Sequence, residues 1–336
     1  MKIGNLALSS SLILSPMAGI SDLSFRILNR RFGCEFAFTE MISARALTYR
    51  NSNTLKMLLA DPSDRPLGMQ LLGNDGKVMA RAIELLREYK PDLIDINAAC
   101  PVAKVTSRGE GSAMLSEPRR LFEMLKTVVS VSEVPITLKI RSGWDHSSVN
   151  AVDVARDAQE AGVSAVFIHG RTREQGYSGE VDYQTIRKVK EALAIPVIGS
   201  GNSFSAPMIK KMFDETGCDA VAIARGALGN PWIFRETEHF LREGRLPEQH
   251  DIRELIETMK LHLDLVVEAD GEKHGTTKFR KFFAWYVRGL HETRSVRSRA
   301  FFAETRAQML ELIDELGRSH FRTRLTSGTK RSWGDQ

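Results

Sequence analysis

The strongest constraint on the fold is a series of short apolar segments that recur through the first two thirds of the chain. Eight such segments are rich in Val, Ile, Leu and Phe and mostly lack polar alternation, which is typical of parallel strands covered on both faces. The intervening segments 77–89, 118–130 and 149–162 carry apolar residues at helical spacing. The predicted strands are 12–14, 36–39, 67–71, 93–96, 136–140, 165–168, 197–198 and 220–224.

Eight strand–helix units within about 230 residues match a (β/α)8 barrel, which usually occupies about 250 residues. An open doubly wound sheet is the alternative, but no G-x-G-x-x-G follows the first predicted strand. We therefore predict an α/β fold, a TIM barrel over residues 1–243. In such barrels the functional groups lie at the C-terminal ends of the strands.

The pattern changes after Trp232, where three amphipathic helices are predicted at 251–268, 276–290 and 300–316 and no strand. We expect the last helix to end at Gly317, because glycine commonly terminates helices. The sequence thus predicts a smaller all-helical C-terminal domain over 250–320. A basic, disordered tail is predicted over 321–336.

The formal net charge of +5 comes from 47 basic and 42 acidic residues that are unevenly distributed. Residues 271–336 carry 14 Lys and Arg against 7 Asp and Glu, so this last part holds the whole positive excess. Such an asymmetry is expected where one part of a chain binds a polyanion. A solvated helical face with a basic tail is the alternative, and charge alone does not decide between them.

Three cysteines, Cys34, Cys100 and Cys218, are too few for a disulfide framework and indicate a reducing compartment. No run approaches the roughly 18 apolar residues that span a membrane. The N-terminus resembles a secretion signal, but Gly4, Asn5 and three serines interrupt its apolar stretch. We expect a cytoplasmic, monomeric protein that binds neither a membrane nor a metal ion.

Several predicted strands end in residues that can perform chemistry. The third carries Gln70, and the fourth carries Asp95 and Asn97 and leads into Cys100. A thiol with a pKa of about 8.5 can donate a proton at neutral pH, so Cys100 is a candidate general acid. Cys34 and Cys218 lie elsewhere and are interpreted as inert core residues.

The fifth strand places Lys139 and Arg141 on one face, where a cation can stabilise negative charge on a reduced cofactor ring. A structural salt bridge from Lys139 to Asp95 is the alternative. His169 and Arg171 end the sixth strand and suit a phosphate contact. The glycine-containing loops 199–202 and 224–227 follow strands seven and eight, where barrels of this kind often bind phosphate. These residues point to a phosphate-bearing planar cofactor.

Eight motifs span the predicted barrel and extend into the helical region: SPMAG (15–19), MQLLG (69–73), DINAACPV (95–102), LKIRSGW (138–144), HGRTREQGYSG (169–179), GSGN (199–202), ARGALGNPWIF (224–234) and FRKFFAWYVRGL (279–290). Together they resemble the tRNA-dihydrouridine synthase family, most closely its bacterial B-type subfamily. The resemblance implies an FMN-bound barrel followed by a helical RNA-binding domain. Such enzymes reduce the C5–C6 bond of uridines in tRNA and use NADPH to recharge the flavin.

The resemblance also assigns roles to residues of this chain. Hydride passes from N5 of reduced FMN to C6 of a uracil that has left its stack, and Cys100 protonates C5. The implied FMN contacts are Pro16, Met17 and Ala18 against the flavin, Gln70, Lys139 and His169 near its ring, and Ser200, Gly201, Asn202, Ala224 and Arg225 at its phosphate end. The implied substrate contacts are Asn97 and Arg141, which would hold the uracil. From charge and position alone, Arg171 at the sixth strand end and Arg280 and Lys281 in the basic helical region are candidates to bind the RNA.

Two positions depart from the family pattern. Asn202 stands where Asp is frequent, and Phe282 stands where His is common after the Arg280–Lys281 pair. A dihydroorotate-type flavin oxidoreductase acting on a free pyrimidine is the alternative enzyme. A non-catalytic RNA-binding protein that has lost its chemistry is the alternative outside enzymes.

Overall fold

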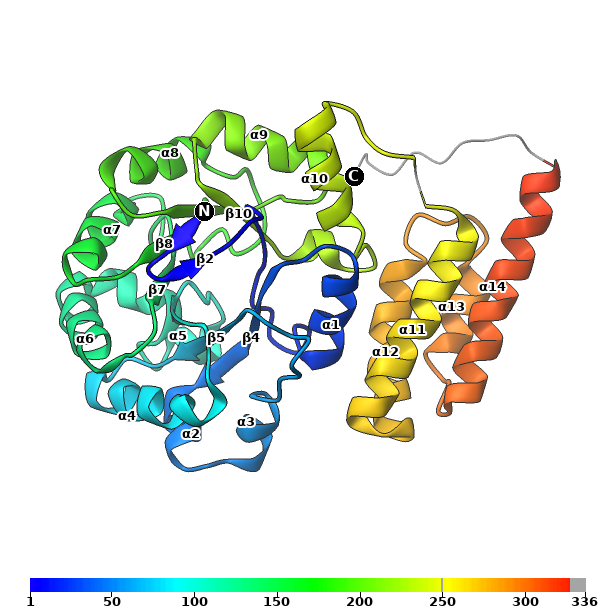
Figure 1. Cartoon of the computed structure of the whole chain (residues 1–336), viewed down its shortest axis with the longest axis horizontal. Coiled ribbons are helices and arrows are strands. Elements are labelled where there is room, and N and C mark those ends of the chain that lie inside the picture. The colour runs from blue at the N-terminus through cyan, green and yellow to red at the C-terminus, as the bar shows by residue number, and fades with distance from the viewer. Residues whose placement is uncertain (249, 327–336) are drawn as a thin grey trace.

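A computed structural model describes residues 1–248 and 250–326, with side chains described up to Arg318. Eight parallel strands close into a barrel in chain order, and the last strand pairs with the first (Figure 1). The predicted barrel is confirmed, and each strand overlaps a predicted one. The strands are β3 (Leu12–Leu14), β4 (Phe36–Ser43), β5 (Leu67–Leu72), β6 (Leu93–Ala98), β7 (Ile136–Arg141), β8 (Ala165–His169), β9 (Val197–Ser200) and β10 (Ala220–Ile223).

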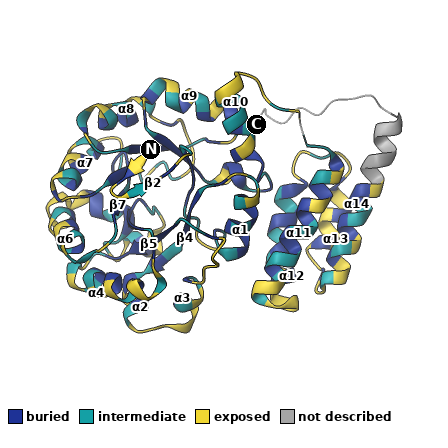
Figure 2. Cartoon of the chain, viewed as in Figure 1, coloured by how far each residue is buried: buried dark blue, intermediate teal, exposed yellow. Residues whose placement is uncertain are grey.

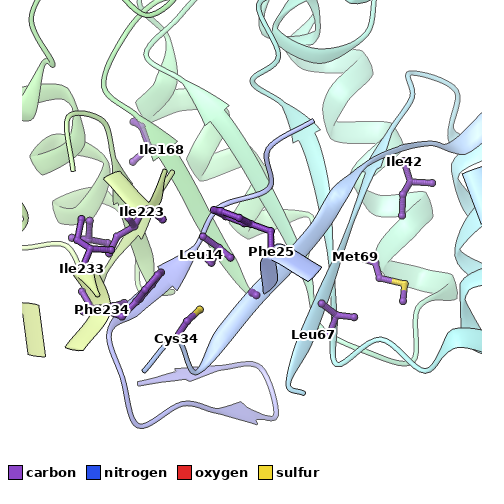
Figure 3. Close-up of a cluster of buried hydrophobic side chains, with 14 of the residues drawn as sticks. Leu14, Phe25, Cys34, Ile42, Leu67, Met69, Ile168, Ile223, Ile233 and Phe234 are labelled. Atoms are coloured by element: carbon purple, nitrogen blue, oxygen red, sulfur yellow. The ribbon is translucent and has the colours of Figure 1, made fainter. Parts of the chain in front are cut away.

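Helices surround the strands and bury their apolar faces against them (Figures 1 and 2). Figure 3 shows part of this core, in which Leu14 of β3 lies beside Phe25 of α1 and Ile223 of β10 lies beside Ile233 of α10. The α-helices are α1 (Leu23–Arg31), α2 (Ala44–Thr48), α3 (Ser52–Lys56), α4 (Gly76–Leu86), α5 (Ala103–Thr106), α6 (Pro118–Val131), α7 (Ala151–Glu160), α8 (Tyr183–Ala192), α9 (Ala206–Thr216) and α10 (Ile233–Glu243). Short 3-10 helices are η1 (Arg87–Tyr89), η2 (Gly111–Ser116) and η3 (Arg225–Ala227).

A two-stranded hairpin that the sequence analysis missed precedes the barrel. Its strands are β1 (Lys2–Ile3) and β2 (Leu6–Ala7), which pair antiparallel. Ile3 and Leu8 are buried with Phe36, Phe38 and Phe167 in a cluster inside the barrel. The hairpin therefore contributes to filling the barrel interior, and its strands are too short to give a periodic signal in the sequence.

Two cysteines are buried core residues, as expected. Burial raises the pKa of Cys34 to about 12, and it also raises the pKa of Cys218. Both thiols therefore stay protonated at neutral pH. None of the described helices is both long enough and apolar enough to cross a membrane.

Up to Thr326, where the described residues end, the C-terminal region contains four helices and not the predicted three: α11 (Ile252–Asp270), α12 (Glu272–Tyr286), α13 (Arg294–Ala300) and α14 (Arg306–Thr326). The prediction missed α13 because only Val296 and Ala300 of that short helix are buried, which gives no clear apolar stripe. Helix α14 passes through Gly317 instead of ending there. A Cβ at Gly317 would lie 3.3 Å from Ile256 of α11, so the glycine permits close helix packing.

The predicted disordered tail, 321–336, is only partly covered by the structure. Its first residues belong to α14, which continues to Thr326. The remainder, 327–336, lies outside the described residues. Helix α10 ends at Glu243 and α11 begins at Ile252, and the division into a barrel domain and a helical domain stays a prediction.

Aromatic side chains form the junction between the barrel and the C-terminal helices. Phe282 of α12 is fully buried, stacks on Phe25 of α1 at 5.7 Å between centroids and lies 4.3 Å from the ring of His262. The His262 ring Nδ1 is 3.0 Å from the hydroxyl of Tyr286. Burial lowers the pKa of His262 to about 3, so this ring is neutral at physiological pH. The departure at Phe282 therefore lies in the junction core and not on the cavity described below.

Truncation of Phe282 is expected to destabilise the protein strongly. Phe282→Ala leaves a cavity between α1 and α11, which typically costs about 3–5 kcal/mol in the free energy of unfolding. Phe302→Ala, at a side chain that is 81% exposed, is the control and should cost less than about 0.5 kcal/mol. Urea unfolding of both variants measures the difference, and equal stabilities would contradict a Phe282-centred junction.

Candidate active site

A cavity of about 1220 Å³ opens at the C-terminal ends of the barrel strands. It exceeds the usual range of about 300–1,000 Å³ for a small-molecule site, so it has room for a cofactor and part of a second molecule. Most residues predicted to form the site line this cavity: Pro16, Met17, Ala18, Gln70, Asn97, Cys100, Lys139, Arg141, His169, Ser200, Gly201, Asn202, Ala224 and Arg225. Arg171, Arg280 and Lys281 are not among its lining residues.

Cys100 lines the cavity from the loop that follows β6 and is partly exposed. Asn97 Oδ1 accepts hydrogen bonds from the backbone N–H groups of Ala99 (3.0 Å) and Cys100 (2.9 Å). The Cys100 carbonyl accepts from the backbone N–H of Ser112 (3.1 Å) and from its hydroxyl (2.9 Å). The loop is thus anchored on both sides of the thiol.

A buried chain of hydrogen bonds runs from Asn97 into the barrel. Asn97 Nδ2 donates to Gln70 Oε1 at 2.8 Å, and Gln70 Nε2 donates to Asp95 Oδ2 at 2.7 Å. The Thr137 hydroxyl donates to Asp95 Oδ1 at 2.6 Å. Gln70, Asp95 and Thr137 occupy paired positions on three adjacent strands, so strand register brings them together. The second contact of Asn97 Nδ2 is the sulfur of Met41 at 3.3 Å.

Burial dominates the electrostatics of Asp95 and Lys139. It raises the pKa of Asp95 to about 6, against hydrogen bonds from Thr137 and Gln70 and the charge of Lys139, which lower it. It lowers the pKa of Lys139 to about 8, against the charge of Asp95, which raises it. Within the described residues, no ion pair of 4 Å or less joins the two groups, so the predicted alternative of a direct salt bridge is wrong.

Arg141 connects the Cys100 loop to the loop after β8. Its Nε donates to the Ala99 carbonyl (2.8 Å), and its Nη1 donates to the carbonyls of Thr172 (2.8 Å) and Gly176 (2.7 Å). The guanidinium lies 5.6 Å from the ring centre of Tyr177, which is 59% exposed. Burial lowers the pKa of Arg141 to about 10, so the side chain stays charged at neutral pH.

Arg171 is buried and fixes the loop that follows β8. Its Nε and Nη2 donate to the Gly179 carbonyl at 3.1 and 2.6 Å, and Nη2 also donates to Asn202 Oδ1 at 2.9 Å. The amide oxygen of Asn202 therefore accepts a hydrogen bond from Arg171 without supplying a negative charge. The sequence singled out Arg171 but could not show that it forms hydrogen bonds to Gly179 and Asn202 of the same protein.

Positive charges converge around His169. Burial lowers the pKa of this histidine well below its usual value, and the charges of Arg141, Lys139, Arg171 and Arg225 lower it further. The ring is therefore neutral at physiological pH. Because like charges repel, this arrangement favours an anionic ligand in the cavity.

Close backbone approaches and unpartnered polar atoms mark the side of the cavity after β9 and β10. Gly201 has a φ of +125°, and a Cβ there would lie 2.9 Å from Val181. A Cβ on Gly226 would lie 1.9 Å from the Ser203 carbonyl oxygen. Ser203 and Asn230 line the cavity, and their buried Oγ and Oδ1 atoms have no hydrogen-bond partner in the described part of the chain. This side thus offers backbone and side-chain groups to a polar ligand, and sequence reasoning missed Ser203 and Asn230.

The C-terminal helices supply one wall of the cavity, through Trp285, Arg288, Gly289, Leu290 and His291. The sequence analysis did not assign this wall, because no strand end leads to it. Its signal is the FRKFFAWYVRGL motif, which contains Trp285 and Arg288.

The two predicted RNA contacts of α12 have partners within the chain. Arg280 donates to the Ala303 carbonyl at 2.9 and 2.7 Å, which holds α12 to the segment after α13. Lys281 donates to the carbonyl of Gly19, in the loop that follows β3. No group of three or more His, Cys, Asp or Glu side chains suited to a metal ion occurs among the described residues.

Comparison with known proteins gives a family match over most of the chain. A model of the dihydrouridine synthase family matches residues 13–321. The tRNA-dihydrouridine synthase B of Vibrio parahaemolyticus is 39% identical over 303 residues, which cover 90% of this chain and 94% of that protein. The protein of the same name from Pseudomonas aeruginosa is 39% identical over 304 residues, with coverage of 88% and 90%.

Solved structures with a similar fold are more distant. Histamine dehydrogenase from Rhizobium sp. 4-9 superposes with a TM-score of 0.54 at 15% identity, over 79% of this chain and 50% of that one. Morphinone reductase superposes with a TM-score of 0.54 at 14% identity, over 74% of this chain and 90% of that one. At such identities the likeness shows the fold alone.

Proposed function

The chain belongs to the dihydrouridine synthase family, and we propose that it reduces the C5–C6 double bond of uridines in tRNA with bound FMN, which NADPH reduces. As a member, it is a flavin-dependent oxidoreductase that forms dihydrouridine in tRNA. The observation that carries the detailed proposal is a single cavity that brings together the Cys100 thiol, the Lys139 ammonium and a cluster of arginines. The cavity also has room for both a cofactor and a base.

The residues on the β9 and β10 side fit a flavin mononucleotide. The unpartnered Ser203 hydroxyl and the close backbone of Gly201 and Gly226 suit a phosphate or sugar oxygen. Arg225 provides a cation for the phosphate. The remaining proposed contacts at this end are Ser200, Asn202 and Ala224, and those along the ring are Pro16, Met17, Ala18, Gln70, Lys139 and His169.

The chain's own groups divide the work on the pyrimidine. A bound, reduced flavin supplies the hydride for C6. The Cys100 Sγ gives its proton to C5, and its partial exposure leaves it accessible from the cavity. Arg141 polarises a uracil carbonyl as negative charge develops. Asn97 reaches the uracil if its weak contact to the Met41 sulfur is exchanged for a carbonyl oxygen.

The substrate base must leave its stack to enter a cavity at a barrel mouth, at a cost of a few kcal/mol. We propose that the helical region, about residues 250–320, is the domain that binds the tRNA around this base. Its wall of Trp285, Arg288 and His291 extends the cavity beyond the barrel. A barrel enzyme for a free pyrimidine has no need of this wall, which favours the RNA substrate. We expect the enzyme to act in the cytoplasm as a monomer.

Replacement of the proposed proton donor tests the mechanism directly. Cys100→Ala is expected to retain FMN but to lose tRNA reduction by at least about 100-fold, because a positioned general acid contributes about 10²–10⁴-fold. Dihydrouridine formation on unmodified tRNA, measured by mass spectrometry, gives the rate. Cys218→Ala removes a buried thiol outside the cavity and should stay within about twofold of the parent. Full activity of Cys100→Ala would remove this residue from the reaction.

The charge of Lys139 predicts a pH dependence of FMN affinity. Its pKa is lowered from 10.5 to about 8, so the ammonium is present below pH 8 and is lost as the pH rises through that value. Affinity for the anionic cofactor should therefore fall between pH 7 and pH 9. Fluorescence titration measures it, and Lys139→Met should bind more weakly at pH 7 and lose most of this dependence. A parent affinity that is constant to pH 9 would contradict the assignment.

A further inference from the structure

We infer that Asp95 is a positioning residue for the Cys100 thiol, through Gln70 and Asn97. This inference rests on the proposed function for its catalytic consequence, but its structural part stands on the hydrogen bonds alone. Asp95 is buried beneath the cavity and is absent from the cavity lining. Its effect on the reaction must therefore pass through other side chains.

The direction of each hydrogen bond in the chain is fixed by the one before it. Asn97 Oδ1 accepts from two backbone N–H groups, so its amide NH2 must point to Gln70. Gln70 then presents its oxygen to Asn97 and its NH2 to residue 95. The last position needs an acceptor, which the Asp95 carboxylate provides.

These hydrogen-bonded side chains also resist displacement, because they are held on neighbouring strands. Gln70 and Asp95 are 1% exposed and Thr137 is 0% exposed. An acceptor lost from position 95 would leave the Gln70 NH2 buried without a partner, and turning the amide over would place two NH2 groups face to face. Either outcome loosens Asn97, and with it the backbone N–H groups of Ala99 and Cys100.

The positioning role does not depend on the charge of Asp95. A proton on Oδ1 would face the Thr137 hydroxyl, which can rotate to accept it, so Oδ2 still accepts from Gln70. The charged or titratable groups that act on the adjacent Lys139 are Asp95 and Arg141, and His169 senses its charge. Charge tuning and positioning can therefore be separated by substitution.

Two substitutions at position 95 make this separation. Asp95→Leu removes the acceptor, whereas Asp95→Asn can accept from Gln70 and donate to the Thr137 hydroxyl. In flavin-loaded protein without RNA, alkylation of Cys100 by iodoacetamide is followed by peptide mass spectrometry. We expect Asp95→Leu to raise the alkylation rate by at least about threefold and Asp95→Asn to stay within about twofold of the parent, because only leucine releases the loop.

Turnover on tRNA should change in the opposite direction to alkylation. Asp95→Leu is expected to reduce dihydrouridine formation by at least about tenfold, because a displacement near 1 Å can cost about 10²-fold. Cys34 and Cys218 must stay unmodified, which shows that the variant is folded. A parent that alkylates normally but never reduces tRNA would refute the proposed function while leaving the loop test valid.

Thr137→Val keeps the test available if Asp95→Leu does not fold. It removes one hydrogen bond to Asp95 and should shift alkylation in the same direction by a smaller factor. The matched control is Thr216→Val, which removes a buried hydroxyl of α9 that takes no part in the hydrogen bonds from Asn97 to Thr137. Parent-like alkylation and turnover in Asp95→Leu, or in Thr137→Val where only that variant folds, would overturn the inference. The inference would also be overturned if Asp95→Asn changed the alkylation rate of Cys100 as much as Asp95→Leu does.

Discussion

The register of the parallel barrel is the constraint on which the site depends. Asn97 pairs with Lys139, Arg141 pairs with His169, and His169 pairs with Ser200 across four neighbouring strands. Side chains alternate between the two faces of each strand, so a slip by one residue would send this whole set away from the cavity. The apolar residues between them, such as Ile96 and Ile140, are fully buried and resist that slip. The fold and the chemistry are therefore specified by the same strands.

The cluster of cations in the cavity destabilises the unliganded barrel but favours the binding of an anion. Lys139, Arg141 and Arg225 line one cavity with no carboxylate among its lining residues, and burial raises the pKa of Asp95 beneath it to about 6. Repulsion among these groups destabilises the unliganded state, so an anionic ligand should stabilise the fold as well as occupy the site. The neutral His169 limits the repulsion, because it adds no further positive charge at physiological pH.

The strand ends were predictable because each follows an apolar run of ordinary length. Gln70, Cys100 and Lys139 were found in this way, and the cavity does collect them. What the sequence could not show is the partner of each polar group. Arg171 suits a phosphate as well as it suits the Gly179 carbonyl, and only the folded loop decides between them. Gly317 likewise suggests a helix end in the sequence, although in the fold it permits close packing of α14 against α11.

A count of charges in the helical region likewise does not show which basic side chains have partners within the protein. Lys278 pairs with Asp22 and Asp270, and Lys281 binds the loop after β3, so both join the helices to the barrel. Arg288, Arg294 and Arg297, by contrast, are exposed and form no ion pair within the described residues. Of these three, Arg288 lines the cavity. The basic excess of the C-terminal region is therefore partly structural, and part of it remains exposed to solvent.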